Sequence, residues 1–476
     1  MPPDNTRSFG GGAATTTLNP LVLVAMVIAV ILILVIRRKY VIFPLLFLVF
    51  LVPTSEQLYV GGVHLFVSRI IILFGVMRML VAKFSANTRV ITGGFNWVDR
   101  AFFWCTICQA CAVSVLFLSG NALINQVGFL WDFLGGYFLL RFLIQDEDDI
   151  YRAIKCLAFI ALICGVCMVE ERETSQNVFA LIGGATGPDV RDGLARCQGP
   201  FAHELMAGAF GATLLPLCIL LWKSGKAKAT ALIGLAGSFL MTWTSNSSTS
   251  LLTFLAGIFA VFFWPFRKSM RAVRWGIVVG LFALQLVMKA PIWFLIAHID
   301  LTGGSSSYHR AELIDLFIRH FFDWWLIGIK SSGAWGWDMW DTQNQFVNVG
   351  ESGGLVAFIL FIAMISVCFA RLGNARKATE GDPKREWLFW LLGAALFSHV
   401  VGFFGVNYFD QTKFVWFLLL AMISAATAPL LQPSTAPKAQ AEMVFGKTPL
   451  GYLTPSPRGA MTKGNRTTVQ FSSRVR

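Results

Sequence analysis

The sequence is poor in charged residues. Only 14% of its 476 residues are charged, against roughly 25% in soluble globular domains, whereas 56% are hydrophobic and the mean hydropathy is +0.64. These values exclude a soluble protein. Apolar runs close to the roughly 20 residues that cross a bilayer recur from Leu18 to Leu431. We therefore predict an all-α polytopic membrane protein with about 12–13 transmembrane helices.

Signals of several other protein classes are missing. Residues 1–17 have no basic region ahead of the first apolar run, and residues 18–36 are followed by basic residues and not by a cleavage site. We therefore expect a disordered tail and an uncleaved helix.

No internal repeat is evident in the sequence, so it does not support the inverted-repeat architecture of many transporters. No Asp-x-Asp and no His/Cys cluster accompanies the arginines discussed below, so we expect neither a metal nor another cofactor.

The formal net charge of +13 is better explained by membrane topology than by nucleic acid binding. Lys and Arg gather in short loops between apolar runs, as is typical of the cytoplasmic side. These basic segments are residues 37–39, 83–100, 152–155, 223–228, 267–274, 371–385 and the tail at 432–476, which we expect to be disordered.

The same alternation defines the predicted membrane domain, residues 18–431. It places the N-terminus outside, the C-terminus in the cytoplasm, and two long extracytoplasmic loops at 170–202 and 298–352. The run at 41–52 is short and contains Pro44, so it is either a span or a re-entrant segment.

Few ionisable side chains fall inside the predicted spans. Arg69, Arg78, Asp132 and Arg141 are the notable ones. Charged side chains within a bilayer usually pair with one another. We expect Asp132 to pair with Arg141, either as a structural pair, which we favour, or as a proton relay.

The first long loop ends in two arginines just ahead of a helix rich in small residues. Arg191 and Arg196 precede Gly199-Pro-Phe and His203. A cation beside a helix N-terminus favours an anion, and phosphate is the natural candidate. The alternative is that both arginines are ordinary hydrated loop charges. A serine- and threonine-rich turn at 242–250 lies on the same side, where we favour helix capping over sugar binding.

The second long loop contains an amphipathic segment that starts near Arg310. Charged residues lie on one helical face and apolar residues on the other, which predicts a helix in the membrane interface, with Arg319 paired to Asp315. Downstream, tryptophans including Trp337 favour either a membrane-interface belt or a sugar site. A polar cluster with Asp341, Gln343 and Asn344 then leads into the next apolar run.

These motifs together resemble the O-antigen ligase and polymerase superfamily of bacterial envelope glycan enzymes. The matching features are an Arg before Gly-Pro-Phe and a helix rich in small residues, an Arg that opens a helix in the second loop, and a polar cluster ending in Asn before Gly354-Leu355. The resemblance runs from about Arg196 to Leu355. It implies a glycosyltransferase C-like fold in the bacterial inner membrane and a polyprenyl-pyrophosphate-linked glycan donor.

The resemblance also implies roles for individual residues. Arg196 and Arg310 would hold the donor pyrophosphate, and the wider set of substrate-binding candidates adds Arg191, His203, Gln343 and Trp337. Gln343 stands where the ligases have their proposed base His, and an amide does not take a proton at neutral pH. Either Asp341, Asp338 or His309 acts as the base instead, or base catalysis is unimportant because pyrophosphate is a good leaving group. We therefore favour a polymerase-type or undefined transfer over a ligase, with Asp341, His309 and Asn344 as catalytic candidates and a glycan or lipid-linked acceptor.

Two other classes of function remain open. A transporter or flippase for a lipid-linked glycan would need charged residues in its spans, and a non-enzymatic subunit would use the same loops to dock polysaccharide assembly proteins. The location of an accumulated intermediate distinguishes a transporter from a transferase. Membrane lipids are expected partners in every case.

Overall fold

Helices make up most of the residues that the structure describes. The computed structural model describes residues 15–86, 90–299 and 307–431. The helices are α1 (Pro20–Val35), α2 (Ile42–Leu51), α3 (Val67–Ala86), α4 (Trp97–Phe117), α5 (Gly120–Leu130), α6 (Gly136–Leu143), α7 (Glu147–Thr174), α8 (Glu204–Ser224), α9 (Lys228–Thr244), α10 (Ser248–Phe262), α11 (Met270–Val287), α12 (Ser307–Arg319), α13 (Phe321–Trp324), α14 (Gln345–Ala378), α15 (Pro383–Gly402) and α16 (Thr412–Leu431).

Two small antiparallel hairpins complete the described fold. They are formed by β1 (Gln57–Val60) with β2 (Val63–Phe66), and by β3 (Asp189–Arg191) with β4 (Leu194–Arg196). Thr17 bridges to Gln57, so the last residues of the predicted N-terminal tail are held against β1. The rest of that tail, 1–14, and the predicted tail at 432–476 lie outside the described residues.

The described residues are mostly helical, as predicted, and their helices are compatible with a polytopic membrane protein. Seven helices in the described part of the chain are long and apolar enough to cross a membrane, and α1 and α10 are shorter apolar helices. The ten residues of α2 extend only about 15 Å, half of a hydrocarbon core of roughly 30 Å. The exact number of spans therefore stays a prediction.

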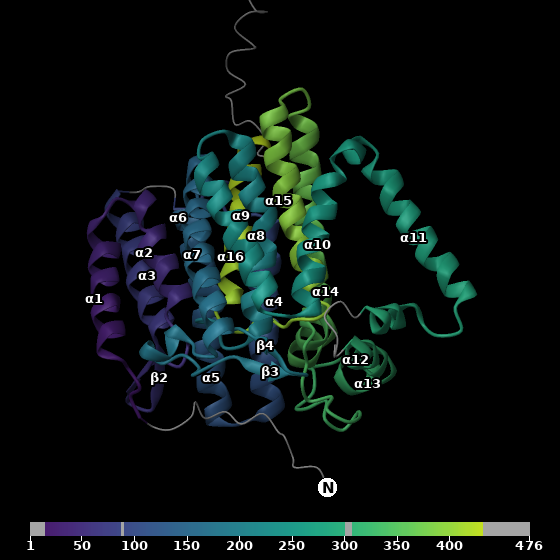
Figure 1. Ribbon diagram of the computed structural model, residues 1–476, viewed down its shortest axis with the longest axis horizontal. Helices are drawn as coiled ribbons and strands as arrows, with labels where there is room; N and C mark the ends of the chain where they lie inside the picture. The colour runs from purple at the N-terminus through teal and green to yellow at the C-terminus, as the bar shows by residue number, and fades with distance from the viewer. Residues whose placement is uncertain (1–14, 87–89, 300–306, 432–476) are drawn as a thin grey trace, which may run out of the picture. The chain divides into compact units, whose positions relative to one another are not determined.

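The segments predicted to be extracytoplasmic gather at one end of the helices (Figure 1). Both hairpins, α12 and α13 lie at this end, and the side chain of Asn19 donates to the Leu181 carbonyl at 2.8 Å within it. The loop boundaries differ from the prediction. The helix before the first loop continues to Thr174, and α14 starts at Gln345, inside the predicted second loop, because Asn344 caps it there.

The centre of the bundle is built on α8, which packs against α7, α9, α10 and α15. Small residues allow these helices to approach closely. A Cβ at Gly237 on α9 would lie 2.4 Å from the carbonyl carbon of Ala161 on α7. Close backbone contact through small residues is the usual way in which membrane helices associate.

The prediction that Asp132 pairs with Arg141 is wrong. Nine residues of one helix separate them, which places them on opposite faces and roughly 13 Å apart along the axis. Arg141 instead binds Asp99, with Nε 2.9 Å from Oδ1 and both side chains fully buried. Asp132 is shared by Arg69 at 3.0 Å and Lys413 at 3.3 Å.

A backbone break in α14 separates its first nine residues from the rest of the helix. At the break, Gly354 has φ 67° and ψ −169°. The Leu355 N–H donates to the Trp325 carbonyl at 2.8 Å, and the Ile329 N–H donates to the Glu351 carbonyl at 2.9 Å. Backbone N–H and carbonyl groups that have no partner within α14 at the break therefore form hydrogen bonds with the segment after α13.

Replacing Gly354 should destabilise the protein strongly. The backbone conformation is one that only glycine adopts readily, at a cost of about 1–3 kcal/mol to other residues. A Cβ would also lie 2.6 Å from the Leu326 carbonyl oxygen. We expect Gly354→Ala to lower the unfolding temperature of the detergent-purified protein. Gly373→Ala on the same helix, where a Cβ meets open space, should leave it unchanged or raise it.

Candidate functional site

The first part of the site is the hairpin of β3 and β4. Asp192 and Gly193, which join the strands, both have positive φ values, 52° and 76°. An Asp-Gly pair is favoured in such two-residue hairpin turns. Asp189 lies opposite Arg196 and Arg191 lies opposite Leu194, so both arginines fall on one face of the hairpin.

Arg196 is held in place by the start of α8. Its Nη2 lies 2.6 Å from Glu204 Oε1, and its Nη1 lies 3.6 Å from Asp189 Oδ2. Glu204 is buried, whereas the side chain of Asp189 is exposed. His203 caps α8 by accepting a hydrogen bond from the Leu205 N–H, and its Nδ1 lies 2.9 Å from Glu204 Oε2. Arg196 therefore already has two carboxylate partners.

The serine-rich turn packs directly against this region. The Cys197 N–H donates to the Thr244 carbonyl at 3.1 Å, and a Cβ at Gly208 would lie 2.2 Å from Ser250 Oγ. Ser247 caps α10 by accepting from the Ser250 N–H, which confirms the predicted capping role. The hydroxyl of Ser250 is buried and has no hydrogen-bond partner among the described residues.

Arg310 lies close to the start of α10. The segment between α15 and α16 brings Gly405 against both groups. A Cβ at Gly405 would lie 2.5 Å from Thr249 Oγ1 and 3.2 Å from Arg310 Nε. Arg310 is 7% exposed, and its Nε has no hydrogen-bond partner. Within residues 15–86, 90–299 and 307–431, no carboxylate lies within ion-pair distance of its guanidinium.

The surroundings of Arg310 are unfavourable to its own charge. Burial, and after it the nearby charges of Arg196 and Arg191, lower the pKa of Arg310 to about 10, while the charge of Asp341 opposes this shift. The guanidinium is still protonated at neutral pH. A buried, uncompensated cation costs free energy that a bound anion would recover.

The polar cluster of the second loop lies beside this arginine. Gln343 Nε2 donates to Asp341 Oδ2 at 2.6 Å, and the charge of Asp341 acts on Arg310. Asn344 accepts from the N–H groups of the first turn of α14 and donates to the Phe404 carbonyl at 3.3 Å. The side chain of Asn344 therefore caps α14 and ties it to the segment after α15.

Three other residues named in the sequence analysis lie outside this polar cluster or at its edge. The His309 ring, on α12, has its Nε2 3.0 Å from the Asp338 carbonyl oxygen, where it can fix the polar cluster. Trp337 is 93% exposed, so its ring does not line a closed site in this structure. Arg319 forms the predicted pair with Asp315, with 2.7 Å between Nε and Oδ2.

The structure also adds residues that the sequence analysis did not name individually, although Thr249 belongs to the turn at 242–250. Glu204, Thr249 and Gly405 come from three different elements and meet around the arginines. Glu204 directly follows His203, and a carboxylate in the first turn of a helix was a usable signal. Gly405 carried no signal, because its role depends on which helices pack together.

This arrangement suits an anionic group. A buried arginine lacking a carboxylate partner lies beside the N-terminus of α10, whose backbone dipole also favours negative charge. In the described part of the chain no group of three His, Cys, Asp or Glu side chains could hold a metal ion. The charges available to an anion here come from arginine side chains.

Neither a protein family model nor a curated protein matches this sequence.

Proposed function

We propose that the chain is a membrane glycosyltransferase of the O-antigen ligase/polymerase type. It transfers or polymerises a glycan from a polyprenyl-pyrophosphate donor on the extracytoplasmic face of the bacterial inner membrane, in exopolysaccharide or O-antigen assembly. The observation that carries the proposal is Arg310, a buried cation without a carboxylate partner next to the start of α10. A pyrophosphate would supply the missing anion.

In the proposed reaction, an acceptor hydroxyl attacks the anomeric carbon of the donor glycan. The bond from that carbon to the pyrophosphate oxygen breaks, and the pyrophosphate leaves with the bonding electrons. Arg310 and the α10 N-terminus stabilise the charge on the leaving group. Asp341, next to Arg310, is the favoured acceptor for the hydroxyl proton, because it is a carboxylate beside the arginine, whereas Asn344 is an amide and takes no proton at neutral pH.

The test is reconstitution of the purified full chain in liposomes with a polyprenyl-pyrophosphate-linked glycan. We expect longer lipid-linked glycan and released polyprenyl pyrophosphate. The same glycan on polyprenyl monophosphate, which is a poorer leaving group, should give much less product. If the donor is recovered unchanged on both leaflets, the enzyme proposal is wrong.

A second candidate function is supported by a separate observation. Arg69, Asp132 and Lys413 form a three-residue ion cluster within the bundle, and such clusters also occur in transporters. A flippase would move the intact lipid-linked glycan between leaflets in the liposome experiment. The amounts of donor accessible to a reagent added outside, before and after incubation, distinguish the two functions.

A further inference from the structure

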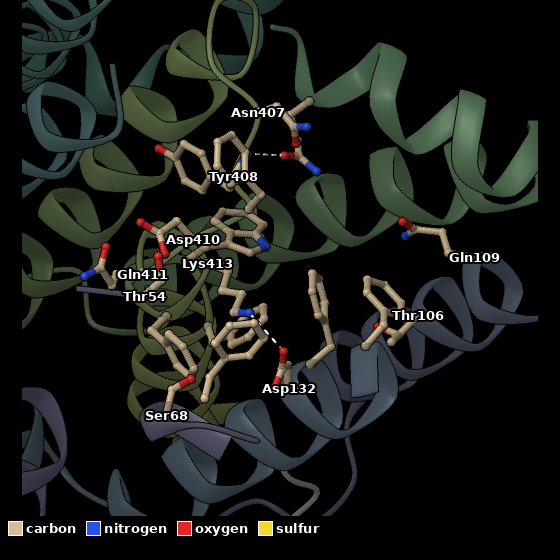
Figure 2. Close-up of a pocket in the computed structure, with 18 of the residues that line it drawn as sticks. Thr54, Ser68, Thr106, Gln109, Asp132, Asn407, Tyr408, Asp410, Gln411 and Lys413 are labelled. Carbon is tan, nitrogen blue, oxygen red and sulfur yellow. Dashed lines mark hydrogen bonds and ion pairs between the residues drawn. The ribbon is translucent and has the colours of Figure 1, made fainter. Parts of the chain in front are cut away.

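A second candidate site lies in a cavity of about 540 Å³ within the bundle (Figure 2). Its volume is in the range that holds small organic ligands. Residues of α2, α3, α4, α5 and α14 line it, and so does the segment at 403–411. This segment is shared between two sites, because Gly405 packs against Arg310 while Asn407, Asp410 and Gln411 face the cavity.

Hydrogen-bond acceptors in this cavity lack donors. Gln411 Nε2 donates to the Val52 carbonyl at 3.0 Å and to the Pro200 carbonyl at 3.1 Å, which fixes the orientation of the amide. Its buried Oε1 has no partner among the described residues, and neither has Asn407 Oδ1. Each such buried acceptor costs about 1–3 kcal/mol when left unpaired. A ligand with hydroxyl groups would satisfy both.

A carboxylate stands between these two amides. Asp410 is 7% exposed, and its Oδ2 accepts from the Ala202 N–H at 2.9 Å. Burial is the largest influence on it and raises its pKa above the usual range. Through this hydrogen bond, Asp410 connects the cavity wall to the loop that follows Arg196. Its carboxylate also adds a hydrogen-bond acceptor to the cavity.

The charge in the cavity differs from that around Arg310. Two cations, Arg69 and Lys413, share the single carboxylate of Asp132, as Figure 2 shows for Lys413. Glu56 and Asp410 add two more carboxylates to the lining. Carboxylates thus outnumber cations, three to two, which disfavours a phosphate or pyrophosphate. A neutral ligand fits better.

The remaining wall is largely aromatic. Six of the rings that line the cavity are those of Phe102, Phe129, Phe133, Phe361, Phe414 and Trp416. Flat apolar rings suit the C–H faces of a sugar, while the amides and the carboxylate suit its hydroxyls. The lining therefore matches a carbohydrate better than a simple hydrocarbon chain.

We propose that this cavity binds a sugar unit of the acceptor saccharide, whose hydroxyls donate hydrogen bonds to Asn407, Asp410 and Gln411. The acceptor role rests on the proposed function. The binding of a neutral saccharide does not, because no pyrophosphate is involved.

The experiment uses a probe that has a sugar but no phosphate. The full chain, held in a sugar-free amphipathic polymer, is photolabelled with dodecyl maltoside that carries a diazirine on the sugar. We expect label on peptides that line the cavity. Unlabelled dodecyl maltoside should displace the probe, and a dodecyl polyethylene glycol of similar size should not.

Variants then test the contacts. Asn407→Leu should weaken probe binding about fivefold to tenfold, as the loss of one hydrogen bond predicts, whereas Asn407→Asp keeps an acceptor and should retain most of it. Gln176→Leu, an exposed amide away from the cavity, is the matched control and should bind as wild type does. Both Asn407 variants are first checked for wild-type unfolding temperature.

Three results would overturn the cavity proposal. They are label outside the cavity, equal displacement by the polyethylene glycol compound, and unchanged binding by Asn407→Leu. Arg310→Ala should still take up label, which separates this proposal from the preceding one. If glycan transfer is intact but the cavity is not labelled, only the cavity proposal is wrong. If the cavity is labelled but no glycan is transferred, the proposed enzyme function is wrong, and the acceptor role of the cavity is wrong with it.

Discussion

Arg310→Ala abolishes glycan transfer while the protein remains in the membrane at its normal level, if the proposed function is correct. The substitution removes the buried cation that would hold the pyrophosphate. Charge-assisted hydrogen bonds contribute about 1.5–3 kcal/mol each, so the loss of two contacts lowers the rate by about a hundredfold or more. Short lipid-linked glycan should accumulate, and its chain length on a gel measures the effect.

Arg319→Ala is the matched control for this experiment. Arg319 lies on the same helix, but its side chain is 69% exposed and pairs with Asp315. Surface pairs of this kind contribute little, so transfer should continue at the wild-type rate. Arg196→Ala should also reduce transfer. Normal polymer from both Arg310→Ala and Arg196→Ala would refute the assignment of these arginines to the site.

The largest loss of stability is expected for Arg141→Ala. This substitution leaves Asp99 fully buried without its cation, with the Tyr137 hydroxyl donating to it at 2.5 Å and the Asn96 N–H at 2.9 Å. Removing one partner of a buried ion pair typically costs about 3–5 kcal/mol. We expect a large fall in the unfolding temperature of the purified protein and reduced recovery from the membrane.

An exposed ion pair provides the comparison. Lys226 Nζ lies 2.6 Å from Asp148 Oδ1, yet both side chains are more than half exposed. Lys226→Ala should therefore change the stability by about 1 kcal/mol or less. The double variant Asp99→Asn with Arg141→Met should recover much of the loss, because it removes both buried charges. Equal unfolding temperatures for Arg141→Ala and Lys226→Ala would contradict a structural role for the Asp99 pair.

Local patterns in the sequence predicted much of what surrounds the site. The alternation of apolar and charged residues predicted α12, and the four-residue spacing predicted the pair of Asp315 with Arg319. The turn at 242–250 was predicted to cap a helix because serine and threonine at helix ends commonly do so, and Ser247 is the residue that caps α10. Each of these features depends on residues that lie within a few positions of one another.

Features that depend on distant residues could not be predicted in the same way. Asp99 as the partner of Arg141, and Gly405 beside Arg310, require knowledge of which helix faces meet. The hairpin of β3 and β4 was missed although Asp192-Gly193 is a usable turn signal. The sequence therefore predicted which arginines belong to the site. It did not predict the buried surroundings that make Arg310 unusual.

The segment at 403–411 gives the two proposed sites a thermodynamic connection. Gly405 touches the Arg310 site and Gln411 faces the cavity, so a shift of this short segment alters both. Coupling between two binding sites is reciprocal. If an anion bound at Arg310 strengthens saccharide binding by some factor, the saccharide strengthens anion binding by the same factor. Donor and acceptor would then each favour the complex that contains both, and unproductive binary complexes would be less populated.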